Sequence, residues 1–233
     1  SDSFRDFVRD LTDELHNELG FEVKKHEELE IKEVRDTINK LRAKNLDDDD
    51  FIKKFSDIFK ENKMESISEG TFFSSILFIS ALDETNKIET FLEKFENAES
   101  PQMQGRYRGV LGQVRDQNAS KKIVEFMLDG RIRGADCPYI LASMITNKYI
   151  GKKSWGLIKE NFNELLNVMP DWTASRILDA LPAIYDDEFA NDIKSFIKKN
   201  PLPSSEKLAA QKLERLEANI EFMDNLKEVN NET

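Results

Sequence analysis

Residues 100–164 read SPQMQGRYRGVLGQVRDQNASKKIVEFMLDGRIRGADCPYILASMITNKYIGKKSWGLIKENFNE, and they predict four short helices in a row. Ser100 can cap the first helix, and Pro101 suits its first turn because proline lacks an N–H that would have no partner there. Asp129-Gly130 predicts the end of the second helix, since glycine tolerates the left-handed exit.

The second half of this stretch continues the helical pattern. Asp136 and Pro138 open a predicted helix over residues 139–146, and a polar turn over 147–154 follows it. Beyond the turn, large apolar side chains recur at helical spacing and form one stripe: Trp155, Ile158, Phe162, Leu165 and Leu166. Nothing in the stretch shows the alternation of a strand, so we expect helices only.

The rest of the chain extends this all-α pattern. Residues 4–19 form an amphipathic helix that ends at Gly20, and the four aspartates 47–50 read as caps of the next helix rather than as a cation site. The apolar segment 66–82 predicts a central helix covered on several sides. Pairs of helices recur along the chain, so we predict an irregular α-solenoid of the HEAT or armadillo type, with about twelve helices and a concave face. Residues 1–233 are expected to form a single helical domain, with a frayed tail at 229–233.

The composition excludes several classes of protein. The 233 residues are 39% hydrophobic, which is enough for a sizeable core, and they carry a net charge of −11. An acidic balance disfavours binding to nucleic acid or to an anionic membrane, so we expect neither as a partner. One cysteine excludes an intrachain disulfide and fits a reducing compartment, which predicts a cytoplasmic protein.

The search for catalytic chemistry finds no complete motif. Residues 26–30 read HEELE and begin like the zinc motif H-E-x-x-H, but Glu30 stands where the second histidine is required. His16 falls on the polar side of the first helix, where solvation is the simplest interpretation. Cys137 has no histidine near it in sequence, and it reads as a packed small side chain. We therefore predict neither a catalytic residue nor a metal ligand in this chain.

Residues 101–133 are basic inside an acidic chain. They contain seven basic residues against three acidic ones, and the basic set is Arg106, Arg108, Arg115, Lys121, Lys122, Arg131 and Arg133. One interpretation is a solvated face held by salt bridges. The other is a surface that receives an anionic group such as a peptide carboxylate, which the planar fork of arginine suits. The candidate substrate-contacting residues are Arg106, Arg108, Arg131 and Arg133.

Several motifs in order resemble one protein family. The sequence PQMQGRYRGVLGQVRDQN at 101–118 resembles a helix–turn of the C-terminal helical domain of aminopeptidase N-type zinc metallopeptidases. Residues 130–166 are similar to the next part of that domain, with Asn147 and Gly151 at its N-x-x-G turn, although this chain has one more residue between the two. The opening segment and LERLEANIEFM at 213–223 resemble the first and last helices that the likeness covers, although Phe222 stands where tryptophan is usual. The likeness includes the archaeal tricorn-interacting aminopeptidases.

The resemblance implies a non-catalytic part of a larger enzyme. In this family the helical domain is a lid over the peptide chamber, whereas the zinc motif and the peptide-anchoring motif lie in an upstream catalytic domain. We therefore expect an excised C-terminal domain whose partners are the catalytic domain of the same polypeptide and peptide substrates, with zinc held by the parent enzyme only. The alternative is a free-standing helical-repeat scaffold that binds a protein. A helical enzyme that uses unclustered carboxylates is a third possibility.

Overall fold

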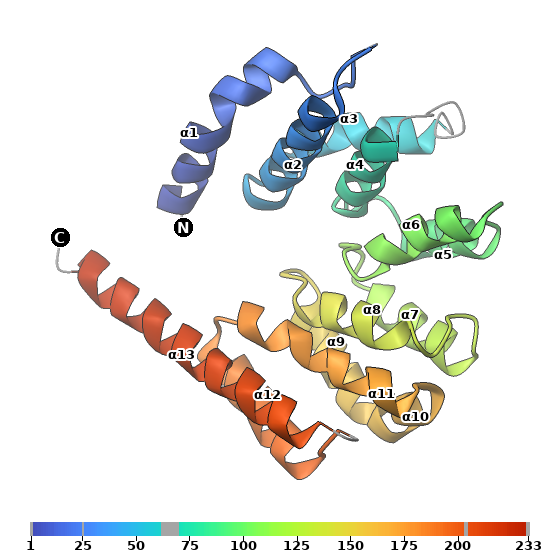
Figure 1. Cartoon of the computed structure of the whole chain (residues 1–233), viewed down its shortest axis with the longest axis vertical. Coiled ribbons are helices and arrows are strands. Elements are labelled where there is room, and N and C mark those ends of the chain that lie inside the picture. Colours follow the sequence, from blue (N-terminus) through green and yellow to red (C-terminus); the bar gives the residue numbers. More distant parts are fainter. Residues whose placement is uncertain (1, 25, 62–69, 203–204, 232–233) are drawn as a thin grey trace. The chain divides into compact units, whose positions relative to one another are not determined.

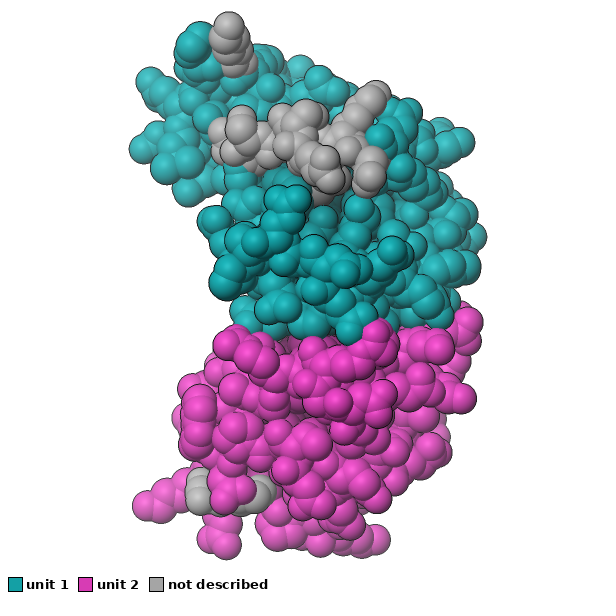
Figure 2. Space-filling view, turned by 90° about the vertical axis from the view of Figure 1, so that its right-hand side faces the viewer, with its two compact units in different colours: residues 1–116 teal, residues 117–233 magenta. Residues whose placement is uncertain are grey.

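The computed structural model describes residues 2–24, 26–61, 70–202 and 205–231, and the regular elements among them are all helices (Figure 1). This confirms the all-α class. The chain divides into two compact units, unit 1 over residues 1–116 and unit 2 over residues 117–233 (Figure 2). The helices of unit 1 are α1 (Asp2–Leu19), α2 (Leu29–Asn45), α3 (Asp49–Lys60), α4 (Gly70–Ala81), α5 (Ile88–Glu96) and α6 (Pro101–Leu111).

Helix α4 is the centre of unit 1. It packs against α2, α3 and α6, and its side chains Phe73, Ile76, Leu77 and Ile79 are almost fully buried. This confirms the predicted central helix from Gly70 onward, while residues 66–69 of the predicted segment lie outside the described residues. A helix that is apolar nearly all round must be covered on several sides.

Phenylalanine rings connect the other helices of unit 1 to this centre. On α3, Phe51 and Phe55 make edge contacts with each other at 5.2 Å, and Phe59 stacks on Phe91 of α5 at 4.9 Å. Helix α3 begins where the four aspartates predict, because the Asp48 carboxylate accepts a hydrogen bond from the Phe51 N–H at 2.9 Å. Aromatic pairs of this geometry add to the free energy gained from buried area.

Helix α1 ends as predicted, and most of its apolar face is exposed. Gly20 adopts φ +70°, and its N–H donates to the carbonyl of His16. Val8 and Leu19 are buried, whereas the rest of the apolar stripe is 43–60% exposed: Phe4, Phe7, Leu11 and Leu15. The periodicity of α1 therefore identified an apolar face of which only one edge is buried against the rest of unit 1.

Unit 2 is also built of helices. They are α7 (Ala119–Leu128), α8 (Cys137–Ile145), α9 (Gly151–Glu160), α10 (Phe162–Val168), α11 (Asp171–Ala174), the 3-10 helix η2 (Ser175–Ala183), α12 (Asp187–Lys199) and α13 (Glu206–Asn231). Helix η2 packs against α8 and α13, and α9 packs against α7 and α8. Neighbouring helices thus stack within each unit, while the solenoid and its concave face stay a prediction. Residues 232–233 lie outside the described residues, so the frayed tail also stays a prediction.

One predicted helix of unit 2 is broken in the structure. The stripe that begins at Trp155 is interrupted at Asn161, whose φ and ψ of −113° and 22° separate α9 from α10. Both pieces remain buried because Trp155 and Phe162 contact the same ring, Phe196 of α12, at 5.3 and 5.0 Å. Helix α11 starts at Asp171 and tightens into η2 after one turn, and Trp172 in it is 75% exposed.

Candidate functional site

The four predicted arginines are divided between the two units, with two in each. Arg106 and Arg108 lie on α6 in unit 1, and Arg131 and Arg133 lie between α7 and α8 in unit 2. The guanidinium of Arg106 lies 5.0 Å from the centre of the Phe73 ring. A Cβ added to Gly70 would come within 2.9 Å of Arg106 Nη2, so the side chain runs close along the start of α4. Arg108 is half-buried in the last turn of α6, where a cation is favourable to the helix dipole.

In unit 2 the two arginines make local contacts. The Arg131 guanidinium stacks 3.5 Å from the centre of the Phe126 ring. Arg133 Nε donates to the Asp136 carboxylate at 2.8 Å, and this hydrogen bond raises the pKa of Arg133. Elsewhere in the basic tract, Arg115 lies 3.7 Å from Asp49. The ammonium groups of Lys121 and Lys122 lie 3.9 and 3.8 Å from the Glu125 carboxylate, so the salt-bridged interpretation describes these lysines as well as Arg115 and Arg133.

The histidines and the cysteine form no reactive cluster. His16 packs edge-on against Phe51, with ring centres 5.4 Å apart, and burial followed by the charge of Arg42 lowers its pKa. Cys137 is fully buried, and burial raises the pKa of its thiol to about 12, as expected for a packed side chain. Within the described part of the chain, no three His, Cys, Asp or Glu side chains are grouped so that they could hold a metal ion.

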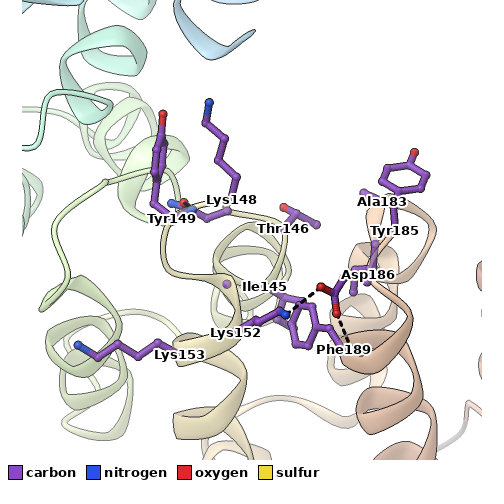
Figure 3. A pocket seen from close by; sticks show the side chains of 13 residues that line it. Ile145, Thr146, Lys148, Tyr149, Lys152, Lys153, Ala183, Tyr185, Asp186 and Phe189 are labelled. Carbon is purple, nitrogen blue, oxygen red and sulfur yellow. Dashed lines mark hydrogen bonds and ion pairs between the residues drawn. The ribbon is translucent and has the colours of Figure 1, made fainter. Parts of the chain in front are cut away.

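Unit 2 contains a pocket of about 550 Å³ that the sequence did not indicate (Figure 3). It lies where the turn between α8 and α9 meets the turn between η2 and α12. Its lining residues include Ile145, Thr146, Lys148, Tyr149, Lys152, Lys153, Ala183, Tyr185, Asp186 and Phe189. The first of these turns is the one that the family resemblance marks by Asn147 and Gly151. Its glycine is required, because a Cβ on Gly151 would lie 2.4 Å from the carbonyl oxygen of Ile145.

An ion pair crosses this pocket. Lys152 Nζ donates to the Asp186 carboxylate at 2.8 Å, and the other oxygen of Asp186 accepts from the Phe189 N–H at the start of α12. The hydrogen bond from Lys152 is the larger cause of the lowered pKa of Asp186, and the Phe189 N–H is the second. Lys153 donates to the Gln117 carbonyl at 2.5 Å, and Lys148 Nζ lies 4.8 Å from the centre of the Tyr149 ring. Figure 3 shows the Lys152 side chain extending toward Asp186, whereas those of Lys148 and Lys153 extend away from it.

The described helices do not include one that is both long and apolar enough to cross a membrane.

The model of the ERAP1-like C-terminal domain family matches residues 1–218. Aminopeptidase M1-B from Oryza sativa subsp. japonica is 22% identical over 184 residues, which are 76% of this chain and 20% of that protein. The chain thus spans about a fifth of the length of this curated relative. These matches confirm the resemblance derived from the motifs: the chain belongs to the family of ERAP1-like C-terminal domains.

Proposed function

We propose that this chain is a non-catalytic part of the helical lid over the peptide chamber of a zinc aminopeptidase. The observation that carries the proposal is the family match over residues 1–218, together with a relative named as an aminopeptidase of which the chain spans only a fifth. The family resemblance places the zinc motif in an upstream catalytic domain, so we assign the metal to that domain of the same polypeptide. The single buried cysteine supports a cytoplasmic parent enzyme.

A lid of this kind acts by sequestration and positioning. Covering the site excludes water, and contacts with the peptide hold the scissile bond near the metal. On unit 1, the candidate contacts are Arg106 and Arg108. The Phe73 ring fixes Arg106, so less side-chain entropy is lost when its guanidinium binds a carboxylate. On unit 2, the candidates are Arg131 and Arg133. Arg133 would replace its ion pair with Asp136 by one with a carboxylate of the peptide.

The test uses the full-length parent enzyme. Changing Arg106 and Arg108 together to glutamine is expected to raise KM for peptides by about tenfold, which corresponds to the loss of one charge-assisted hydrogen bond. The kcat and the cleavage of single aminoacyl reporters should stay the same. The matched control is Lys121→Gln with Lys122→Gln, which removes the same charge from α7. An Arg variant with the KM of the control would overturn the assignment of these two residues.

The lid role itself has a separate test. The purified 233-residue chain should leave aminoacyl reporters uncleaved, with or without added zinc. Efficient zinc-dependent cleavage by this chain would show that it carries its own catalytic site and would end the proposal.

The exposed stripe on α1 favours a second candidate function, a free-standing scaffold that binds a protein. Phe4, Phe7, Leu11 and Leu15 present a row of large apolar side chains, as interaction surfaces do. The coding sequence upstream of Ser1 separates the two functions. An H-E-x-x-H motif followed by a distant glutamate supports the peptidase lid, and a start codon directly before Ser1 supports the scaffold.

A further inference from the structure

We propose that the exposed apolar face of α1 is a docking surface for an amphipathic helix with lysine or arginine along one edge, and that this helix belongs to another part of the parent polypeptide. The docking surface has two components on α1. They are the apolar stripe, Phe4, Phe7, Leu11 and Leu15, and the acidic row beside it, Asp10, Glu14 and Glu18. The proposal rests on the proposed function, because it takes the chain to be part of a longer enzyme.

The apolar stripe has no full cover among the described residues. Its four side chains are 43–60% exposed, although the same helix buries Val8 and Leu19 against the rest of unit 1. Helix α2, which packs beside α1 (Figure 1), adds three apolar side chains that are 36–58% exposed: Leu29, Ile31 and Val34. In proteins built of stacked helical pairs, the terminal pair has a polar outer face. An outer face that is apolar therefore indicates a contact with a further helix.

The acidic row determines which charge the partner carries. Asp10, Glu14 and Glu18 follow one another at intervals of four residues, so they project from one side of α1, at the edge of the stripe. Like charges at this spacing repel each other. Within the described part of the chain, none of these three carboxylates forms an ion pair, whereas two acids farther round the helix do, Asp6 with Arg9 and Asp13 with Arg42. Basic side chains on the partner would relieve the repulsion along the row.

A second copy of the chain fits this surface poorly. Two α1 helices packed antiparallel through their stripes would place one acidic row against the other, and the net charge of −11 opposes the approach of two copies. The parent polypeptide can supply the helix instead, because the chain spans only a fifth of the length of its aminopeptidase relative. A helix of the same polypeptide also docks at a high effective concentration.

Helix α1 is held in place without the partner. Arg35 of α2 donates to the Leu19 carbonyl at the end of α1, and Arg42 donates to the Thr12 hydroxyl at 2.8 Å in the middle of the helix. Near the start, Arg5 donates to the Asp47 carboxylate at 2.7 Å. A surface that is already formed lowers the entropy lost when the partner binds.

The experiment adds two helical peptides to the purified 233-residue chain and measures their binding by fluorescence anisotropy. Both peptides have the same leucine stripe, with lysines beside it in one peptide and glutamates in the other. We expect the lysine peptide to bind about tenfold more tightly than the glutamate peptide, because only the lysines face charges of opposite sign. The difference should shrink in about 1 M salt, where the Debye length is roughly 3 Å.

Two pairs of variants test the residues. Glu14→Gln with Glu18→Gln should weaken binding of the lysine peptide about fivefold, whereas Glu89→Gln with Glu93→Gln, the same change at the same spacing on α5, should not. The first of these variants should unfold in at least as much urea as the native chain, since repulsion within α1 is lost.

The stripe is tested in the same way. Phe7→Ser with Leu11→Ser should abolish binding of both peptides. The control is Tyr139→Ser with Trp172→Ser, which removes two exposed aromatic rings from unit 2 and should leave binding unchanged.

The source of the helix is tested with the parent enzyme. There the surface should already be covered, so the lysine peptide should bind about tenfold more weakly than it binds the 233-residue chain. Equal binding would show that the surface is free in the parent enzyme and serves a separate protein. A dimer of the 233-residue chain in sedimentation velocity that Phe7→Ser with Leu11→Ser dissociates would make a second copy the occupant. Either result overturns the proposal, as would equal binding of the two peptides or a Glu14 and Glu18 variant that binds like its control.

The outcome is separate from that of the lid proposal. If the Arg106 and Arg108 variant raises KM in the parent enzyme while the α1 surface is free there, only the docking assignment is lost. If the surface is covered in the parent enzyme while the 233-residue chain cleaves reporters, only the lid is lost.

Discussion

Replacing Glu27 with glutamine should destabilise unit 1 more than any other single loss of surface charge. Arg35 of α2 is almost fully buried, with 1% of its side chain exposed, and its two terminal nitrogens donate to the two carboxylate oxygens of Glu27. The same guanidinium donates to the Leu19 carbonyl at the end of α1, at 3.2 and 3.3 Å. Glu27 therefore neutralises the charge that joins the end of α1 to α2.

The size of the effect follows from what remains when the charge is lost. Breaking a buried ion pair by removing one partner costs about 3–5 kcal/mol, because the other charge stays buried. The Leu19 carbonyl and the amide oxygen of the new glutamine would still accept hydrogen bonds from Arg35. We therefore expect the lower end of the range, a loss of about 3 kcal/mol in the free energy of unfolding of unit 1.

The pH dependence has a definite sign. The hydrogen bond from Arg35 is the largest cause of the lowered pKa of Glu27, which lies below its ordinary value of 4.5. A carboxyl whose pKa is lower in the folded state stabilises the fold above its unfolded pKa, and this stabilisation is lost as pH falls through the folded value. The difference between the Glu27→Gln protein and the native protein should therefore be full at pH 7 and shrink below about pH 4.5.

The assay is urea unfolding followed by circular dichroism, with hydrogen exchange of the α1 amides as a local readout. Glu28→Gln is the matched control, because Glu28 is the exposed neighbour and its side chain makes no capping bond to α2. Changing Glu27 to leucine together with Arg35 to methionine should restore most of the stability, since no unpaired charge is left. A Glu27→Gln protein within about 0.5 kcal/mol of the control would refute the reasoning.

Alanine substitutions at two glycines of α9 should have opposite effects on stability in urea unfolding. Gly151→Ala should lower the free energy of unfolding by about 2 kcal/mol, because the new Cβ would meet the Ile145 carbonyl. Gly156→Ala has open space around its Cβ and should raise the free energy of unfolding by up to about 1 kcal/mol through helix propensity. Equal urea midpoints for the two variants would contradict this. Burial lowers the pKa of His16 below its ordinary value of 6.5, so the opening free energy of α1 should fall as pH falls below about 6.5, because the unfolded state binds a proton first. The readout is the exchange of the α1 amides after correction for the pH dependence of the intrinsic exchange rate. His16→Leu should remove this pH dependence. The charged groups that also act on the pKa of His16 are Arg42, Lys54, Asp13 and Asp48.

Helix starts and ends were the most predictable part of this fold, because the chemistry that sets them is local. The Ser100 hydroxyl accepts from the Met103 N–H at 3.2 Å, as the Ser-Pro pair predicts. Gly130 takes φ +74° at the end of α7, as Asp129-Gly130 predicts. In each case the deciding residues lie within four positions of each other, so a short window of sequence contains the physical cause.

The break between α9 and α10 was not predictable in this way. Apolar side chains continue at helical spacing across Asn161, so periodicity alone predicts one uninterrupted helix. The residue that both pieces contact is Phe196, 34 positions beyond Phe162. The exposed stripe on α1 has a related origin, because an apolar pattern shows which face can be buried but not what covers it.

The pocket of unit 2 shows why a count of local charges is a weak guide to where a pocket lies. The tract 101–133 had the largest basic excess, and its Arg133 already donates to Asp136 three positions away. Lys148, Lys152 and Lys153 read as an ordinary polar turn, and the carboxylate that defines their pocket, Asp186, lies 34 positions after Lys152. Sequence supplies the charged residues, and the meeting of two distant turns supplies the pocket.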